Sequence, residues 1–591
     1  MRRLLLAVFG CALACAPAAG EADGAPRATG FVPSFPPKPH FRAAPPPARG
    51  ARLRAETPLP SFYDIRSNGW VTAVKKQGNY GSCWAFAACA SVESALIKAG
   101  LSESPDLSEK NLVNLKGDSG GHGIYGGDIY SPLGYFSRWQ GGVREELDPY
   151  PTSGSSVASF GTSPEFAPCC YVSKAVLLPA RTNVSDNAFI KRALVEYGAL
   201  FVNYFHDDDI GTDNWAGTIC ITNEQYWAKA NHAVTLVGWD DDFMIGSHAG
   251  AFIVKNSWGT RYGEKGYYHI AYDDVTFCTG MGAEAYVVET NGFSASVVYQ
   301  YDRTCYLGYE SGCYSSLAGG RIAGVGFNRY TASGDQEIVA VGLFAPIEDA
   351  RYKIAIYGAG AAEALHSQTG ALLEMGYHVI PLSQAVAVPA GTVFDVELDI
   401  DIPYVVPAGG EAYATYPLAI EYLPHAADGI VGESYAYNCE LEGWVRMQDA
   451  DENLVLKAFA RPTGAAKGRL LADANATVTN GAEVVSWYAN YADASLHGNT
   501  YGALAGSLCA NGYPAVDNWC MGLDPTNEAS AITANLTFTN GAPCVTVSPA
   551  TDRCEYVTEG RASLADGDWS DALYDGTHRF FRITARPKTG E

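Results

Sequence analysis

Three residues far apart in the chain have the side chains that a nucleophilic hydrolase needs, and the first is a cysteine. Cys83 precedes an alanine-rich run with few β-branched residues that closes at Gly100. This composition predicts a helix over residues 85–98, with Cys83 in its first turn. The N–H groups and dipole of a helix N-terminus favour negative charge, and a thiol there can have a pKa of roughly 3.5–7.5 instead of about 8.5. Cys83 is therefore predicted to be a nucleophile.

A histidine and an asparagine complete the predicted set. His232 opens an apolar run, residues 233–239, that predicts a buried strand, and Asn256 follows a second predicted strand, residues 251–255. Cys, His and Asn suit the roles of nucleophile, general base and orienting group. A structural thiol and a core histidine are the alternatives, and the presence of all three residue types favours catalysis over them.

The segments around these residues resemble the papain-like cysteine peptidases. The resemblance rests on Gln77 before Cys83-Trp84, on Asn231-His232-Ala233 and on Asn256-Ser257-Trp258-Gly259. His232 lies 149 residues after Cys83 (232 − 83), within the spacing of about 130–150 residues typical of the family. Asn256 lies further away, and the extra residues are expected to form a longer loop at 240–250. The resemblance implies an α+β fold with a helical lobe, a β lobe and the active site between them.

The resemblance also implies a role for each matched residue. Cys83 would attack the peptide carbonyl, and His232 would act first as base and then as acid. Gln77 and the Cys83 backbone N–H would donate to the oxyanion, and one such donor is worth about 10²–10³ in rate. Asn256 would accept a ring N–H of His232 and fix its tautomer.

The substrate-binding candidates are Gly126, Gly127, Asn231 and Trp258. The two glycines match the paired glycines beside which a peptide backbone lies in this family, and glycine permits close approach because it has no side chain. Plain loop glycines are the alternative. Asn231 directly precedes the candidate base. Trp258 is expected to shield the bond between His232 and Asn256 from water, with core packing as the alternative.

No metal, cofactor or nucleic-acid partner is expected. Asp240-Asp241-Asp242 lacks a surrounding pattern of oxygen ligands, so a solvated acidic loop is favoured over a metal site. The net charge of −24 argues against nucleic acid, because backbone phosphates require Lys and Arg for neutralisation. The expected partners are protein or peptide substrates, and the chain is expected to be a monomer.

The first residues predict export. Arg2-Arg3 precede an apolar run that ends near Ala16 and is too short to span a membrane, so residues 1–19 are predicted to be a secretory signal peptide. No other apolar run reaches membrane-spanning length. A lipid anchor at Cys15 is disfavoured, because Ala12 stands where Leu is usual in a lipoprotein junction. A secreted or cell-surface location is therefore predicted.

The cysteines fit an oxidising compartment. Of the 15 in the chain, two lie in the predicted signal and one is Cys83, which leaves twelve (15 − 2 − 1), an even number compatible with disulfides. Their connectivity cannot be deduced from the sequence. The common disulfides of the family's helical lobe are missing, because Tyr80 and Leu115 stand where Cys is usual. Cys89 is therefore expected to be a core residue.

The chain is expected to contain several domains. Residues 20–56 are rich in Pro, Ala and Arg and predict a linker or short pro-segment. The peptidase should extend over residues 57–292. It should include helices at 107–113, capped by Ser108, and at 186–197, capped by Ser185.

The remainder of the chain is expected to be β-rich. Short apolar strands separated by Gly, Pro and Asp predict an all-β sandwich over residues 297–460. Its motifs, including Tyr352-x-Ile354-x-Ile356, resemble the lectin-like domain that follows papain-like domains in some bacterial surface peptidases. Core packing is favoured over sugar stacking for its larger aromatics, among them Tyr377, Trp444 and Phe459. Residues 468–591 are expected to form a further β-rich C-terminal module.

The sequence thus predicts a secreted or cell-surface cysteine endopeptidase with accessory β-domains for surface or glycan attachment. A non-catalytic surface adhesin on a peptidase scaffold is one alternative, and a transpeptidase using the same thioester chemistry is another. The presence of Cys83, His232 and Gln77 together favours an enzyme over an adhesin.

Overall fold

The computed structural model describes most of residues 58–463 and the backbone of five strands between residues 533 and 587. The longest internal gaps are residues 117–122, 152–159, 222–228, 304–314, 404–416 and 423–431. The predicted signal peptide, residues 1–19, and almost all of the predicted linker, residues 20–56, lie outside the description. Within the described residues, no helix is both long and apolar enough to cross a membrane.

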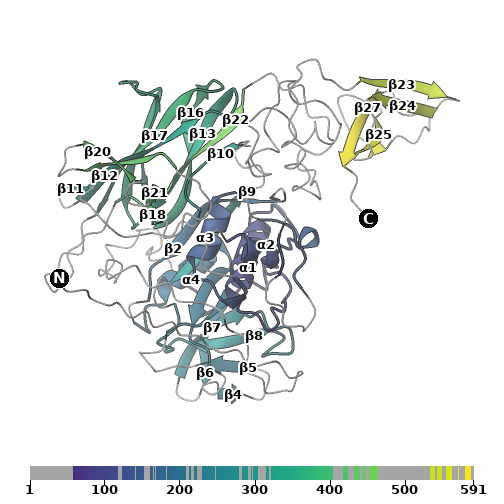
Figure 1. Ribbon diagram of the computed structural model, residues 1–591. Helices are drawn as coiled ribbons and strands as arrows, with labels where there is room; N and C mark the ends of the chain where they lie inside the picture. Colours follow the sequence, from purple (N-terminus) through teal and green to yellow (C-terminus); the bar gives the residue numbers. More distant parts are fainter. Residues whose placement is uncertain are drawn as a thin grey trace, which may run out of the picture.

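The first domain, residues 58–289, combines four α-helices with a sheet among the residues that the structure describes (Figure 1). The helices are α1 (Cys83–Lys98), α2 (Glu109–Asn114), α3 (Tyr130–Ser137) and α4 (Ala188–Tyr197), with short 3-10 turns at Gly123–Tyr125 and Glu145–Leu147. The strands are β1 (Phe62–Asp64), β2 (Tyr171–Leu178), β3 (Leu200–Tyr204), β4 (Thr212–Asn214), β5 (Thr218–Ile221), β6 (His232–Ile245), β7 (His248–Lys255), β8 (Tyr267–Ala271) and β9 (Ala283–Glu289).

Helix α1 lies at the centre of this domain. Its residues from Cys83 to Leu96 are all buried, and most of them are apolar. It packs against α2 and α3 in the helical lobe and against β3, β6 and β9 in the β lobe. The start of the helix therefore lies between the two lobes, which is where the family resemblance predicts the active site.

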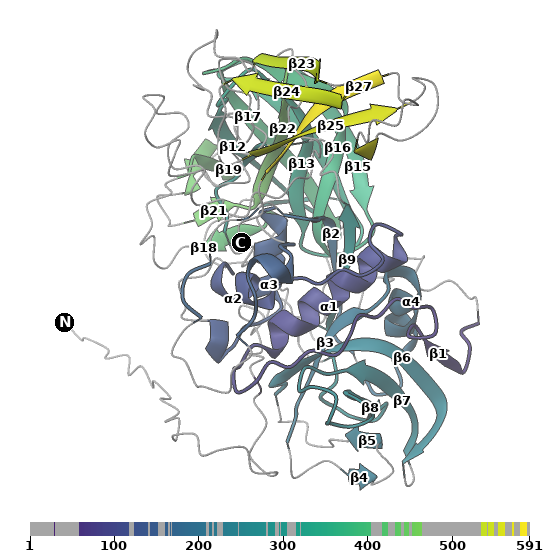
Figure 2. The same ribbon diagram turned by 90° about the vertical axis from the view of Figure 1, so that its right-hand side faces the viewer.

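The second domain, residues 297–463, is a β-sandwich (Figure 2). Its strands are β10 (Val297–Tyr299), β11 (Ser315–Ala318), β12 (Arg321–Thr331), β13 (Gln336–Ala345), β14 (Ala350–Gly358), β15 (His366–Leu372), β16 (Gly376–Val388), β17 (Val393–Pro403), β18 (Ile420–Tyr422), β19 (Ser434–Asn438), β20 (Gly443–Arg446), β21 (Glu452–Leu454) and β22 (Leu456–Pro462). Along β12, buried and partly exposed residues alternate, which is the period of a strand with one face in a core. The all-β sandwich predicted for residues 297–460 is confirmed.

A single sheet continues from the first domain into the second. Its order is β10-β22-β13-β16-β2-β9-β3-β6-β7-β8-β5-β4. The two domains join where β16 pairs antiparallel with β2, with Tyr377 opposite Ala175. The rings of Trp139 and Phe459 lie 4.1 Å apart across the same junction, and both belong to the core that surrounds α1. Backbone pairing and a shared core thus hold the two domains together.

Two local predictions are wrong. Helix α4 begins at Ala188 with Asn187 in the cap position, because the Ser185 side chain donates to Asn183 Oδ1 in the preceding turn. Residues 240–250 do not form a long loop, because β6 and β7 continue as a hairpin in which Asp240 pairs with Ala251. The acidic residues Asp240–Asp242 therefore lie on a strand, and Asp241 forms an ion pair with Lys191.

Other local predictions are confirmed. Helix α1 covers the predicted run, and α2 begins after Ser108, whose side chain accepts a hydrogen bond from Asn111 N at 3.0 Å. Helix α4 ends at Gly198, which has a φ of 96°. Cys89 is a buried thiol, 1% exposed.

Five strands lie in the predicted C-terminal module. β23 (Thr533–Thr539) pairs with β24 (Ala542–Ser548), and β25 (Cys554–Arg561) pairs with β26 (Ser570–Asp571) and β27 (Phe580–Pro587), coloured yellow in Figure 1. The rest of residues 468–591 lies outside the description.

Candidate active site

Cys83 is the first residue of α1, and the turn before it is fixed by hydrogen bonds. Ser82 occupies the cap position without a side-chain capping bond, because its hydroxyl lies 2.7 Å from Tyr150 Oη. Tyr150 Oη in turn donates to Gln77 O at 2.9 Å. The Sγ atom of Cys83 accepts a hydrogen bond from Ala233 N at 3.5 Å, which places the thiol beside the residue that follows His232.

His232 and Asn256 form the second part of the site. His232 Nε2 and Asn256 Oδ1 lie 2.9 Å apart, and the two residues are 0% and 3% exposed. Because a carboxamide oxygen only accepts, this contact assigns the ring proton to Nε2 and leaves Nδ1 as the acceptor nitrogen. Nδ1 has no hydrogen-bond partner among the described residues. The imidazole is therefore set up to take a proton at Nδ1.

Burial controls the charge of His232. The pKa of His232 is lowered to about 3, mainly by loss of solvation and also by the neighbouring His206, while the contact with Asn256 opposes both effects. An imidazolium on its own is thus disfavoured at this position. A negative partner next to the ring would offset the cost, and a thiolate at Cys83 would be such a partner.

Trp258 covers the imidazole. Its ring stacks on His232 at 4.5 Å between centroids with an interplanar angle of 22°. Tyr262 packs edge to face against Trp258, at 4.8 Å between centroids. This stacking is compatible with the predicted shielding of the bond between His232 and Asn256 from water, and that role of Trp258 stays a prediction.

His206 is a neighbour of the site that sequence reasoning missed. Its ring lies 5.9 Å from His232 and 4.7 Å from Trp258. Both atoms of the Asn231 amide hold its backbone, because Oδ1 accepts from His206 N at 2.7 Å and Nδ2 donates to His206 O at 2.9 Å. His206 follows the end of β3 by two residues and belongs to no recognisable sequence motif. The pairing of β3 with β6, which sets Tyr204 opposite His232, brings it to the site, and no signal in the sequence gives that pairing.

Gln77 is held by contacts that cross between the two lobes. Its Oε1 accepts from Ser257 Oγ at 2.6 Å, and its Nε2 donates to Tyr80 O at 2.7 Å. The backbone repeats the link, because Gln77 N donates to Ser257 O at 2.8 Å. Gln77 is thereby fixed next to the residue that follows Asn256.

The paired glycines lie beside the turn that precedes Cys83, since Gly81 N donates to Ile124 O at 2.6 Å. Gly126 has a φ of 152°. A Cβ atom at Gly127 would lie 2.5 Å from the Trp84 ring, so packing inside the protein already requires glycine there. This internal reason exists independently of any contact with a substrate backbone.

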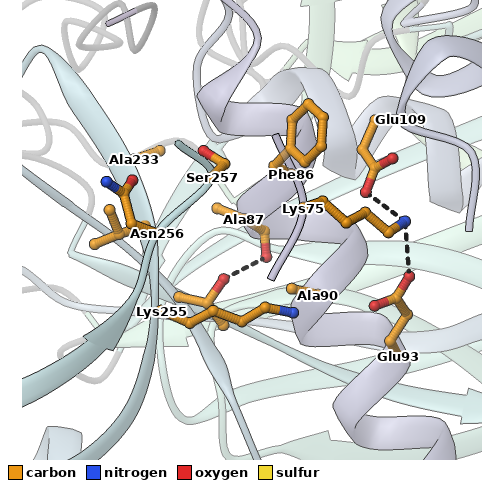
Figure 3. A pocket seen from close by; sticks show the side chains of 12 residues that line it. Lys75, Phe86, Ala87, Ala90, Glu93, Glu109, Ala233, Lys255, Asn256 and Ser257 are labelled. Atoms are coloured by element: carbon orange, nitrogen blue, oxygen red, sulfur yellow. Dashed lines mark hydrogen bonds and ion pairs between the residues drawn. The ribbon is translucent and has the colours of Figure 1, made fainter. Parts of the chain in front are cut away.

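A buried ionic cluster lies behind the start of α1 and involves both lobes (Figure 3). Lys75 Nζ lies 2.8 Å from Glu109 Oε1 and 3.4 Å from Glu93 Oε1. From the β lobe, Lys255 Nζ donates to Thr72 Oγ1 at 3.0 Å. Lys75 and Lys255 are close in sequence to Gln77 and Asn256 respectively, so the cluster supports both segments that carry the site.

Comparison with known proteins identifies both domains. Residues 59–288 match the family model described as papain family cysteine protease, and residues 298–460 match the model described as lectin like domain. The chain carries a papain-family cysteine protease domain followed by a lectin-like domain. The first domain is called the peptidase domain from here on, and the second the lectin-like domain.

The peptidase domain is similar to characterised members of the family. It is 33% identical over 223 residues to cysteine proteinase 1 of Entamoeba histolytica. This alignment covers 37% of this chain and 65% of that protein. The peptidase domain is 29% identical over 225 residues to cathepsin R of Mus musculus, which covers 37% of this chain and 63% of that protein. The chain thus spans somewhat less than two thirds of the length of these relatives.

The two-domain arrangement has a structural counterpart. The crystal structure of the cysteine protease and lectin-like domains of Cwp84, a surface layer associated protein of Clostridium difficile, aligns with a TM-score of 0.53 at 21% identity. The alignment covers 69% of this chain and 90% of that one. At this identity the likeness establishes the shared fold of the two domains together.

Proposed function

We propose that the protein is a cysteine endopeptidase that hydrolyses peptide bonds through a thiolate at Cys83 and an imidazolium at His232. The observation that carries the proposal is the 2.9 Å contact of His232 Nε2 with Asn256 Oδ1, next to a thiol at the start of a buried helix. Because Asn256 occupies Nε2, the proton from Cys83 goes to Nδ1. Asn256 acts as the group that orients the base.

The reaction follows from this arrangement in two stages. The Cys83 thiolate attacks the scissile carbonyl, and the tetrahedral oxyanion forms near the N-terminus of α1, where the backbone N–H of Cys83 and Gln77 Nε2 are the proposed donors. His232 then protonates the leaving amine, which leaves a thioester at Cys83. Water activated by the neutral imidazole hydrolyses the thioester.

Replacing the nucleophile tests this proposal. We expect Cys83→Ala to lower kcat/KM on a peptide library by at least about 10³-fold, as removal of a covalent nucleophile does. Cys89→Ala is the matched control, because Cys89 is a buried thiol on the same helix and should retain most of the activity. A thiol-directed peptidyl epoxide should label Cys83 in the folded protein. A folded wild type that is neither labelled nor able to cleave any library peptide would overturn the proposal.

Two alternatives share parts of this evidence and have separate tests. An adhesin with a peptidase scaffold would bind its target equally well with and without Cys83. A transpeptidase would pass the thioester to an amine, so product analysis with an added amine nucleophile would give amide instead of free acid. Hydrolysis as the main outcome is what we expect.

We further propose that the protein works outside the cell or on its surface. The support is the predicted signal peptide at residues 1–19 and the likeness in fold to Cwp84, which is a surface layer associated protein. N-terminal sequencing of the protein recovered from the medium and from the envelope fraction tests this proposal. A mature chain that begins before residue 10 and stays in the cytoplasm would contradict it.

We also propose that the lectin-like domain attaches the enzyme to glycans through one face of the sandwich. Trp444, 46% exposed, packs edge to face against Phe327 at 4.9 Å and Tyr437 at 5.7 Å, and Phe327 stacks on Tyr435. The strand registers place these rings on the same side of β12, β19 and β20, and flat exposed aromatics suit stacking on sugars. Of the aromatics singled out in the sequence, Tyr377 and Phe459 are fully buried and cannot serve.

A glycan array tests the attachment proposal. The wild type should bind at least one glycan class, and Trp444→Ala should lose most of that binding while the peptidase activity stays unchanged. Leu365→Ala, at an exposed position of the same domain, is the control. Equal binding by the wild type and Trp444→Ala would show that this face is not the site.

A further inference from the structure

A second thiol site lies in the helical lobe, away from Cys83. Cys169 and Cys170 directly precede β2, and Cys170 is 1% exposed while Cys169 is partly exposed. Cys169 N donates to Gly142 O at 2.8 Å. Gly142 has a φ of 76°, and a Cβ atom there would lie 2.5 Å from Cys170 Sγ, so only glycine allows the segment to pack so closely on the thiol pair.

The two thiols differ in character. A hydrogen bond from Cys170 and the guanidinium of Arg144 lower the pKa of Cys169, against the effect of partial burial. The same contact and full burial raise the pKa of Cys170 well above its usual range. Arg144 Nη1 also lies 3.5 Å from Glu146 Oε1, and the neutral Cys169 thiol donates a hydrogen bond to Gly142 O. Cys169 is therefore the nucleophilic member of the pair.

Cys169 opens onto a hollow of about 560 Å³. This volume suits a small molecule. The residues that line it with Cys169 include Pro168, Arg144, Glu146, Leu101 and Asp106. A ligand in the hollow would thus reach the more acidic of the two sulfurs first.

We propose that Cys169 and Cys170 form a thiol–disulfide exchange site that takes a low-molecular-weight disulfide from this hollow. The Cys169 thiolate attacks one sulfur of the small disulfide, forming a mixed disulfide and releasing one small thiolate. Cys170 then loses its proton to water and attacks Cys169 Sγ, which releases the second small thiolate. The two cysteines are oxidised to a vicinal disulfide, and the small disulfide is reduced to two thiols.

Chain geometry makes this state reversible. Adjacent Cα atoms are about 3.8 Å apart across a trans peptide, below the roughly 4.4–6.8 Å usual for disulfides. A bond between neighbours is therefore strained, and strained disulfides are readily reduced. The pair would respond to the redox state of the surroundings rather than form a permanent cross-link.

The test uses the full-length chain with Cys83→Ala, so that failure of the peptidase proposal does not affect it. The protein is incubated with hydroxyethyl disulfide, and the peptide containing residues 169 and 170 is followed by mass spectrometry. We expect this peptide to lose two hydrogen atoms without keeping an adduct, and a small thiol to reverse the change. In Cys170→Ser the mixed disulfide on Cys169 should accumulate, and in Cys169→Ser the reaction should slow at least tenfold.

The rate provides a second measurement that does not depend on removing either thiol. Alkylation of Cys169 should show a pH midpoint below the roughly 8.5 of an ordinary thiol. Arg144→Gln should raise that midpoint, and at pH values below it each unit of upward shift should slow alkylation about tenfold. Arg144→Lys keeps the positive charge and should retain most of the wild-type rate. A midpoint at or above the ordinary value, or a mixed disulfide that persists with Cys170 present, would overturn the proposal.

Discussion

The chain has two junctions between folded parts, and the contacts that matter most at each differ in kind. Beside the active site, the two lobes of the peptidase domain are joined by directional side-chain hydrogen bonds, such as Ser257 Oγ to Gln77 Oε1 and Lys255 Nζ to Thr72 Oγ1. Between the peptidase and lectin-like domains they are strand pairing and aromatic packing, such as Trp139 on Phe459. Hydrogen bonds fix individual atoms for chemistry, whereas apolar packing stabilises without selecting one atom. Four changes test this contrast.

The largest effect is expected at the domain junction. Phe459→Ala removes a fully buried ring and should lower the free energy of unfolding by about 3–5 kcal/mol. Because the core is shared, urea unfolding followed by fluorescence and by activity should shift together. Leu365→Ala, at a site that is 57% exposed, should change stability by no more than about 0.5 kcal/mol. If Phe459→Ala lost activity at the same urea concentration as the wild type, the two domains would unfold independently.

The lobe junction should respond in rate more than in stability. Gln77→Ala should lower kcat by about 10²–10³-fold, equivalent to about 2.7–4 kcal/mol of transition-state stabilisation. Ser257→Ala keeps the Gln77 amide and removes only the bond to its Oε1, so a smaller loss is expected. Steady-state kinetics on a single peptide substrate gives the kcat of both variants for comparison. Equal losses would mean that the position of Gln77, rather than its N–H, limits the rate.

Acid should weaken the domain junction through His378, which lies on β16 opposite Lys174. Burial lowers the pKa of His378 to about 4, below its unfolded value of about 6.5. The unfolded chain therefore binds the extra proton, and stability should fall by up to about 1.4 kcal/mol per pH unit as pH drops from 6.5 to about 4.

His232, with its similarly lowered pKa, adds a slope of the same sign. His378→Asn should remove the contribution of His378 to the slope of the unfolding free energy against pH. Urea unfolding at several pH values measures this slope. An unchanged slope in this variant would exclude His378 as a contributor.

The smallest effect is expected next to the base. His206→Gln removes a charge 5.9 Å from His232, so the pKa of His232 should rise by about 0.5–2 units for effective dielectric constants between 80 and 20. NMR titration in the Cys83→Ala background measures it. His269→Gln, at a ring stacked on Phe243, should leave the value unchanged. A shift in both variants would point to a change in packing rather than in charge.

The sequence predicts the site better than its surroundings. Cys83, His232 and Asn256 stand in short motifs whose meaning is local, and the structure brings His232 and Asn256 into contact. Their catalytic roles stay predictions. His206 lies in no motif and reaches the site only because β3 pairs with β6, which depends on the three-dimensional fold.

The errors have physical causes as well. Ser185 and Asn187 are both good capping residues, and the competing turn at Asn183 decides between them. Asp240–Asp242 resemble a loop because acidic residues are rare in strands, yet Asp240 pairs with both β1 and β7, and β6 continues through the segment. The pairing of β2 with β16 joins residues about two hundred positions apart, and no local pattern encodes it.

The pairing of β2 with β16 has a consequence for any shortened form of the protein. A chain ending after β9 would leave part of β2 with unsatisfied backbone groups and would uncover Trp139, which is 4% exposed in the whole protein. An exposed edge strand beside an exposed indole ring favours self-association of the protein. The peptidase domain should therefore be produced together with the lectin-like domain, which permanently covers a surface that would otherwise aggregate.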